Sequence, residues 1–308
     1  MAQTRGVVPA LYDNVDKTMF NVFKDELNEN PKIYTRLFNI ETSDRKFERH
    51  VSYALFTDSP LKAEGADYTT QLIQQGYTKD FTHLEFGLGF EITQTAQEDD
   101  VYDVVNQYGT GLARSCRVTQ ETYGAAVLND GFTTETTPDG LSLFNTAHTL
   151  ITGGTARNRR DAALSYTSLQ QALIDMANDQ KSDEGFFTSS VSGYELWVPP
   201  ALMMTAYRLV DSSGLPSSND NDINPLNKQY SIDVVVNPYL GAAVGGSDTA
   251  WFLVYKGKRT GLISYNRVAI TMQPPERLPK SGNRFYAVRF RASWGARDWR
   301  GSYGSAGA

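Results

Sequence analysis

Hydrophobic residues near the start of the chain follow a helical spacing. Between Leu11 and Asn28 they recur at steps of three and four, and the pattern stops before Pro31. The apolar positions are Tyr12, Val15, Met19, Val22, Phe23 and Leu27. A lone amphipathic helix of this length is marginal in water. We therefore expect it to pack on the rest of the chain or on a neighbouring chain.

The next part of the chain follows an alternating pattern instead. Apolar residues from Phe47 to Leu55 are spaced mostly by two, and a second alternating run extends from Tyr77 to Ile92. Residues 62–67 between the two runs are small and polar, as in a loop tip. The pattern predicts a long two-stranded hairpin. Because an isolated hairpin is marginal in water, we expect it to lie on another subunit.

Residues 95–129 return to helical spacing and form the longest helix that the sequence predicts. Thr95 and Glu98 fit an N-terminal capping box, and Gly131 follows at the position of a C-terminal cap. Cys116 lies on the apolar stripe and is interpreted as a small apolar core residue. The stripe consists of Val101, Val105, Tyr108, Leu112, Cys116, Thr119, Tyr123 and Val127.

The last part of the chain interleaves helices and strands. A capping box at residues 167–170 starts a helix whose apolar face extends to Ala177. Pro199 and Pro200 suit the start of a second helix, which Gly214 closes. Strands are predicted at residues 194–198, 232–236, 250–255, 268–272 and 285–293. Because the order is irregular rather than a repeated βαβ unit, the fold class is predicted to be α+β.

Composition places the chain among ordinary folded proteins. It has 308 residues, of which 40% are hydrophobic, with 29 Lys and Arg against 35 Asp and Glu, so the formal net charge is −6. These values exclude a disordered or collagen-like chain. No run of about 18 apolar residues could span a membrane, and no apolar signal segment follows Met1. The acidic balance argues against tight nucleic-acid binding.

Groups that could carry chemistry are scarce. One cysteine and three histidines allow no intrachain disulfide and no recognisable metal spacing. Phosphate-loop, dinucleotide and nucleophile-elbow motifs are missing. His148 with Asp139 and Ser142 could form a hydrolytic triad, but a histidine bonded within its own loop is the favoured interpretation. We therefore predict that the protein is not an enzyme and has no catalytic, cofactor or metal site.

The order of predicted elements resembles the Hong Kong 97 fold of tailed-bacteriophage major capsid proteins. Shorter motifs resemble the Mu-like major head subunit branch of these proteins. Residues 128–132 and 139–148 are similar to the branch pattern "L-x-D-G-F … D-G-x-x-F-F-x-x-x-H-P", with Thr149 in place of the proline. Residues 196–202 resemble its strand, V-P and helix segment. Gly65, Gly76 and Tyr77 also match this branch.

The resemblance implies a division of the chain into regions with separate roles. The predicted regions are an N-terminal arm at 1–44, an extended E-loop at 45–84, a peripheral domain at 85–165 with a spine helix at 95–129, an axial domain at 166–265, and returning strands of the peripheral domain at 266–308. The loop 212–225 would lie near the local symmetry axis. Because the arm helix begins at Leu11, a separate scaffold or none is expected rather than a fused scaffolding segment.

The function implied by the resemblance is that of a major capsid protein. Copies would self-assemble as hexamers and pentamers into an icosahedral shell around a tailed phage's double-stranded DNA genome, without sequence-specific DNA binding and without a membrane. Further expected partners are a portal and decoration or scaffold proteins. The protein would be located in the virion and assembled in the host bacterial cytoplasm.

Candidate contacts between subunits lie on the predicted hairpin and on the C-terminal strand. They are Phe47, Tyr53, Lys62, Glu64, Asp67, Arg289 and Arg291. Paired charges among them would fix register more than they add affinity. Two alternatives stay open at this point: an encapsulin-like cellular compartment with the same fold, and a cytoplasmic hydrolase centred on His148.

Overall fold

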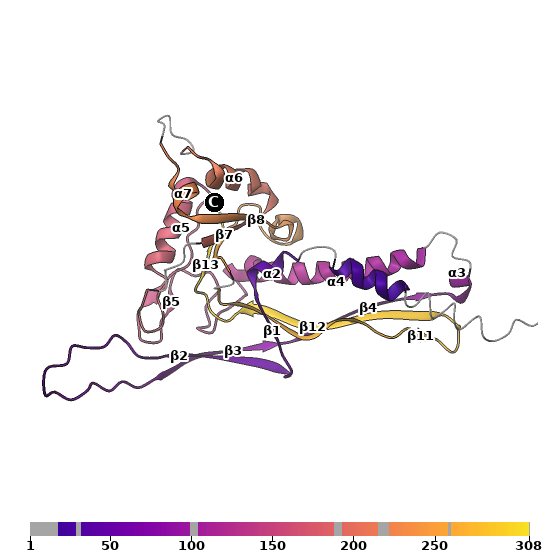
Figure 1. Cartoon of the computed structure of the whole chain (residues 1–308), viewed down its shortest axis with the longest axis horizontal. Coiled ribbons are helices and arrows are strands. Elements are labelled where there is room, and N and C mark those ends of the chain that lie inside the picture. Colours follow the sequence, from indigo (N-terminus) through magenta and orange to yellow (C-terminus); the bar gives the residue numbers. More distant parts are fainter. Residues whose placement is uncertain are drawn as a thin grey trace, which may run out of the picture.

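Two sheets organise the molecule, and they lie in different lobes (Figure 1). The computed structural model describes residues 18–28, 32–98, 104–187, 193–214, 222–257 and 260–307. One sheet contains β1 (Asn39–Thr42), β4 (Leu84–Ile92), β10 (Leu262–Met272), β11 (Glu276–Arg277) and β12 (Arg284–Ala296). The other has the order β13 (Ser302–Ser305), β9 (Trp251–Tyr255), β7 (Gly193–Val198), β8 (Ser231–Val236). Two lobes of mixed helix and sheet confirm the predicted α+β class.

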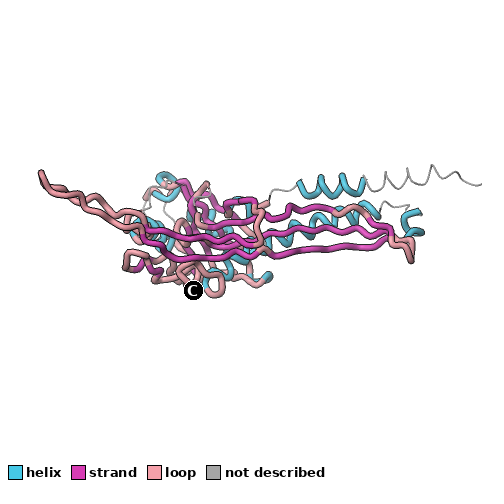
Figure 2. Tube along the Cα trace, turned by 90° about the horizontal axis from the view of Figure 1, so that it is seen from below, coloured by secondary structure: helices cyan, strands magenta, loops and turns pink. Residues whose placement is uncertain are grey.

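The five-stranded sheet is built around β12, which pairs antiparallel with both β10 and β4. A long helix, α4 (Val104–Asn129), runs beside this sheet, as Figures 1 and 2 show. Its 26 residues make a rod of about 39 Å at 1.5 Å per residue. Leu112 and Cys116 of α4 share a buried cluster with Val288 and Phe290 of β12. This lobe contains most of the residues for which a peripheral domain is predicted.

The ends of the predicted helix 95–129 differ from the sequence prediction. Within that range the structure describes α3 (Gln94–Glu98) and α4, and residues 99–103 lie outside the described residues. The capping prediction was wrong, because Thr95 lies inside α3 and the hydroxyl of Thr93 accepts the Ala96 N–H at 3.2 Å. Gly131 is not a left-handed cap either. It lies in a 3₁₀ turn (Asp130–Phe132), where a Cβ would stand 2.7 Å from the Phe144 ring.

The N-terminal arm packs on its own chain. Residues 18–28 are helical, whereas residues 11–17 of the predicted helix lie outside the described residues. Met19 lies over Gly109 and Tyr34 over Gly124, so the arm runs along α4 in the same direction. A Cβ at Gly109 would lie 2.5 Å from the sulfur of Met19, and a Cβ at Gly124 would lie 2.7 Å from the Cβ of Tyr34. Small residues on α4 thus let the arm helix and α2 (Tyr34–Leu37) come close.

Substitution of these glycines separates packing from helix propensity. We expect Gly124→Ala to lower the free energy of unfolding by about 1–3 kcal/mol, because the new methyl group overpacks against Tyr34. Gly111→Ala is the matched control, since a Cβ at Gly111 has no neighbour within 4 Å. That control should raise stability by up to about 1 kcal/mol. Urea unfolding of the unassembled subunit measures both, and equal effects would contradict close packing at Gly124.

Glu121 of α4 fastens the arm through backbone hydrogen bonds. Its carboxylate accepts the N–H groups of Ile33 at 2.7 Å and Tyr34 at 3.0 Å. Burial raises the pKa of Glu121 and outweighs these hydrogen bonds, which act in the opposite direction. The ionised form is therefore disfavoured in the folded chain. A group of this kind stabilises the fold fully below its unfolded pKa of about 4.3, and this contribution is lost as the pH rises through the folded pKa.

The pH dependence of Glu121→Gln tests this sign. Because glutamine does not ionise, we expect the unfolding free energy of the variant to rise relative to wild type as the pH increases from about 4 towards 7. Urea unfolding of unassembled subunits across that range measures the difference. A difference that stays constant with pH would contradict a raised pKa at Glu121.

The four-stranded sheet carries the second lobe, which contains most of the residues for which an axial domain is predicted. Its central strand β7 is almost fully buried and pairs parallel with β8 and antiparallel with β9. The predicted strands 194–198, 232–236 and 250–255 are confirmed as these three strands. Helices α5 (Tyr166–Asn178), α6 (Met203–Asp211) and α7 (Pro225–Gln229) complete the lobe. The capping box of α5 uses Ser165 and Ser168, so the prediction of Thr167 as its first residue was wrong.

Region boundaries in the structure cross those expected from the sequence. The segment 266–308 was expected in the peripheral domain, but β13 pairs with β9 in the other lobe. Strand β10 begins at Leu262, and β1 of the expected arm pairs with it. The last strand of the chain therefore ties the two lobes together.

A hairpin of β2 (Phe47–Ala54) and β3 (Gln74–Thr82) extends away from both lobes (Figure 1). Residues 55–73 form the distal part and contain no regular strand. The predicted run 77–92 is divided at His83, where the chain passes from the hairpin into the five-stranded sheet. The His83 ring lies between the hydroxyls of Ser293 at 3.0 Å and Ser43 at 3.1 Å, which fixes this corner.

Candidate functional site

The distal hairpin is the largest collection of exposed apolar side chains on one segment of the described chain. Leu61 is fully exposed, at 102% of its reference area, and Tyr68 and Leu72 are 84% and 88% exposed. Leu55, Phe56 and Ile73 are the other members, and the exposed Tyr53 adjoins them on β2. Soluble monomers rarely present apolar residues in this density, and such patches mark interaction surfaces.

Four of the predicted hairpin contacts, Tyr53, Lys62, Glu64 and Asp67, lie on this surface or beside it, whereas Phe47 lies at the base of the hairpin, where β2 begins. Phe47 and Tyr53 are about half exposed, and the Arg49 guanidinium lies 5.7 Å from the centre of the Phe47 ring. The Lys62 ammonium stands 4.9 Å from the centre of the Tyr68 ring. Contacts of this cation–π kind hold the cations on the exposed surface at modest energy.

Glu64 and Asp67 are exposed at the hairpin turn. Gly65 between them has φ +77°, a conformation that residues with a Cβ rarely adopt. The turn therefore displays two carboxylates on a backbone shape that requires glycine.

Arg289 and Arg291 lie on β12, apart from the hairpin contacts. Arg289 Nε donates to Glu85 of β4 at 2.5 Å, and Arg291 Nε lies 4.0 Å from the same carboxylate. The hydrogen bond from Arg289, reinforced by the attraction of both arginines, holds the pKa of Glu85 below its usual range. The structure thus brings the predicted contacts together as two groups, one on the hairpin and one on the sheet.

The two-stranded part of the hairpin, as far as Leu55, is held to the rest of the subunit by contacts that the sequence did not predict, here named the root contacts. Lys79 Nζ binds Glu135 at 2.7 Å and also the carbonyl of Thr136. A carboxylate oxygen of Glu184 accepts the Leu55 N–H at 2.6 Å. A Cβ at Gly76 would collide with Ile151.

These root contacts fix the direction of the hairpin relative to both lobes. They come from separate loops of the chain, so no local sequence pattern could have identified them.

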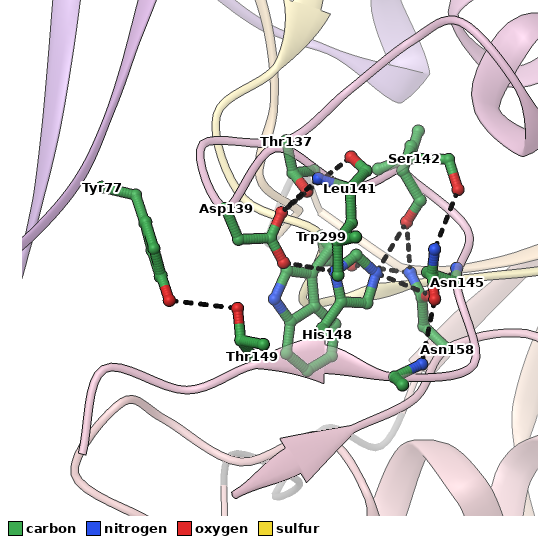
Figure 3. A network of polar contacts seen from close by, with 12 residues as sticks. Tyr77, Thr137, Asp139, Leu141, Ser142, Asn145, His148, Thr149, Asn158 and Trp299 are labelled. Atoms are coloured by element: carbon green, nitrogen blue, oxygen red, sulfur yellow. Dashed lines mark hydrogen bonds and ion pairs between the residues drawn. The ribbon is translucent and has the colours of Figure 1, made fainter. Parts of the chain in front are cut away.

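His148 is the centre of a buried polar network, shown in Figure 3. Its Nδ1 lies 2.7 Å from Asp139 Oδ2, and its Nε2 lies 3.2 Å from Asn158 Oδ1. The ring stacks on Trp299 with 4.5 Å between centres and 3° between planes. Burial opposes ionisation of Asp139, but hydrogen bonds from His148 and Thr137 outweigh it and lower the pKa of Asp139.

A hydrolytic triad of Ser142, His148 and Asp139 is not formed. The Ser142 hydroxyl donates to the carbonyl of Phe144 at 3.0 Å, and no hydrogen bond joins it to His148. His148 is fully buried, so a substrate could not reach its ring. The network instead joins the loop 139–158 to Trp299, close to the strand β13 that links the lobes. Asp139 and His148 of the branch-like motif therefore have a structural role.

The thiol of Cys116 on α4 is buried as well. Burial raises the pKa of the Cys116 thiol to about 11, which leaves it protonated at neutral pH. No group of three or more potential metal ligands occurs among the residues that the structure describes. Within the same residues, no helix is long and apolar enough to cross a membrane.

Solved capsid structures share this architecture. The capsid of cyanophage P-SCSP1u is 13% identical over 90% of this chain and 88% of that chain, with a TM-score of 0.61. A structure from Mycobacterium phage Che8 is 12% identical over 90% and 93% of the two chains, with a TM-score of 0.55. A virus-like particle from Pyrococcus furiosus is 11% identical over 94% and 98%, with a TM-score of 0.52. The fold is therefore that of Hong Kong 97-type shell subunits.

Residues 76–304 match the model of a family described as phage capsid protein, and the chain belongs to that family. It is a major capsid protein of a bacteriophage head, which confirms the resemblance in fold and function. Comparison with curated protein sequences gives no match. Membership of the Mu-like branch stays a prediction.

Proposed function

We propose that the chain assembles as hexamers and pentamers into an icosahedral shell that encloses the double-stranded DNA of a tailed phage. The observation that carries this proposal is the hairpin, whose distal apolar residues are exposed in the single subunit. Many weak interfaces of this kind, repeated around symmetry axes, close a container cooperatively. The net charge of −6 supports enclosure of DNA without adhesion to its phosphates.

The roles of the regions follow from the same proposal. The hairpin, within 45–84, would lie over a neighbour, and the lobe carrying α5, α6 and α7 would face the local symmetry axis with loop 212–225. Residues 215–221 of that loop lie outside the described residues. The helix α4 would be the spine of the peripheral domain, whose last strands end before β13.

Contacts between copies would join the two groups of predicted residues. Glu64 and Asp67 on one hairpin have the charge to face Arg289 and Arg291 of a neighbour. Both arginines share one carboxylate, Glu85, so one positive charge of the group is left for a partner. Such exposed pairs would fix the register of docking more than its affinity.

The protein would have no enzymatic activity of its own. Full burial of His148 and the raised pKa of Cys116 both support this part of the proposal. Assembly would take place in the cytoplasm of the host bacterium, with a portal and with decoration or scaffold proteins as partners.

Electron microscopy of the purified, expressed protein tests the shell. We expect uniform closed or tubular particles, and nuclease-resistant DNA in particles taken from infected cells. Small monodisperse oligomers at all concentrations would contradict the proposal. Particles that contain a cargo protein in place of DNA would indicate an encapsulin-like compartment instead.

A further inference from the structure

A turn between α5 and β7 supplies the outermost of the root contacts. Residues 181–187 form this turn, with a β-bridge between Lys181 and Phe187 and with Gly185 at φ +91°. Glu184 precedes this glycine, and its carboxylate accepts the Leu55 N–H. Leu55 directly follows β2, and no regular strand continues from it through residue 73. The turn 181–187 therefore meets the hairpin where its paired strands end.

The pairing of the hairpin strands is interrupted shortly before this contact. The register of β2 and β3 shifts between Val51 and Tyr53. At the shift, the Ser52 hydroxyl donates to the carbonyl of Tyr77 at 3.1 Å and accepts the N–H of the same residue at 2.9 Å. A bulge of this kind bends a strand and interrupts the ladder. Two paired positions, Tyr53 and Ala54, follow before β2 ends, so pairing within the hairpin determines the direction of the distal part only weakly.

A small polar recess of about 50 Å³ lies beside this bulge. It is lined by Ser52 and Tyr77 of the hairpin and by Asp183 and Arg300 of the rest of the subunit. A volume of this size holds a few water molecules. Because the hairpin is not packed tightly against the subunit here, a contact further out is needed to fix the direction of its distal part.

Arg300, in the segment between β12 and β13, holds the turn 181–187. Its Nη2 donates to Asp183 Oδ1 at 3.0 Å, and its Nε donates to the Lys181 carbonyl at 2.5 Å. Its Nη1 donates to Asp298 Oδ1 at 3.1 Å. Burial acts to lower the pKa of Arg300, but the carboxylates of Asp298 and Asp183 outweigh it and raise the pKa. One charged, planar group thus binds the turn at two points.

Arg300 also contacts the buried network around His148. The Arg300 Cζ lies 4.7 Å from the centre of the Trp299 ring, and this ring stacks on His148 (Figure 3). Stacking on an aromatic face restrains a guanidinium group. The contacts therefore run in order from the network through Trp299 and Arg300 to the turn 181–187, and from the turn to Leu55.

We propose that Arg300 is the positioning residue for the hairpin: it holds the turn 181–187, and Glu184 of this turn then fixes the direction of the distal residues 55–73. The importance of this direction for assembly rests on the proposed function. A lysine cannot replace Arg300, because a single ammonium group lacks the planar set of donors that binds Asp183, Asp298 and the Lys181 carbonyl together.

Distances between two spin labels on the unassembled subunit test this role. The parent chain carries Cys116→Ala, which removes the only native cysteine. Glu64→Cys on the hairpin turn and Met204→Cys on α6 provide exposed sites for the labels. Double electron–electron resonance then measures how widely the distance between the two labels is distributed. A narrow distribution is expected for the parent chain, because its hairpin is held in one direction.

Arg300→Lys and Glu184→Ala should each widen this distribution. We expect a width about twofold larger than in the parent chain, because Leu55 loses its restraint in both variants. If Arg300 acts through Glu184, adding Arg300→Lys to Glu184→Ala should widen the distribution no further. A general loss of packing would not produce this lack of additivity.

Arg160→Lys is the matched control for Arg300→Lys. Arg160 donates to both oxygens of the buried Asp175 carboxylate on α5, so the same kind of group is replaced. This control should leave the distribution as it is in the parent chain. An unchanged distribution with Arg300→Lys, equal widening with Arg160→Lys, or further widening in the Glu184→Ala background would overturn the inference.

Asp183→Asn replaces Arg300→Lys if that variant does not fold. It weakens the same contact from the side of the turn and keeps the pair of Arg300 with Asp298, so the same widening is expected. Because the labels are measured on single subunits, the result does not depend on whether shells form. Wild-type protein that never forms particles contradicts the proposed function, whereas an unchanged label distance contradicts only the role of Arg300.

Discussion

Deletion of residues 58–69 should abolish shells while leaving the rest of the chain folded. The deleted segment bears Leu61 and Tyr68, which are exposed in the single subunit and so contribute little to its stability. The root contacts of Lys79 and Leu55 stay in place. We expect the unfolding free energy to change by no more than about 0.5 kcal/mol. Electron microscopy and sedimentation measure assembly, and circular dichroism measures the fold.

A full-length variant separates the length of the hairpin from its apolar surface. Leu61→Ser combined with Tyr68→Ser and Leu72→Ser keeps the turn but removes apolar area that a neighbour would bury. We expect this variant to lose assembly as the deletion does. Intact shells from the deletion would contradict the assignment of the hairpin as an assembly element.

His148→Ala should produce the largest loss of stability among single substitutions in the network. It removes the partner of the buried Asp139 carboxylate and the ring that stacks on Trp299. We expect a cost of about 3–5 kcal/mol, because the substitution leaves a cavity of the size of the ring beside Trp299 and removes one of the hydrogen-bond partners of the buried carboxylate. Urea unfolding of the unassembled subunit measures the loss.

His50→Ala is a suitable control for this substitution. His50 is half-buried at the base of the hairpin and does not take part in the network around His148. Its replacement should cost about 1 kcal/mol or less. A hydrolytic activity that His148→Ala removes without loss of stability would contradict the structural role and support the hydrolase alternative.

Local patterns predicted most strands and helices correctly, because a run of apolar residues or a helical spacing is visible within a single element. The runs 194–198, 232–236 and 250–255 are strands of one sheet, and the stripe of the long helix faces the other. Caps were predicted less well. At Thr95 and Thr167 a neighbouring residue, Thr93 or Ser165, has the capping role instead. Several polar residues near the start of a helix can cap it. Which of them does so depends on the residue at which the preceding chain turns into the helix.

The sequence by itself determined the class of the fold and the family resemblance, because hydrophobic period and short motifs are local properties. Only the tertiary structure decided that the arm packs on its own α4 and that β13 joins the distant sheet. It also decided that Asp139 and His148 hold each other in a buried network. The physical reason is that a period shows which face of an element is buried, whereas the partner that buries it depends on contacts between residues far apart in the chain.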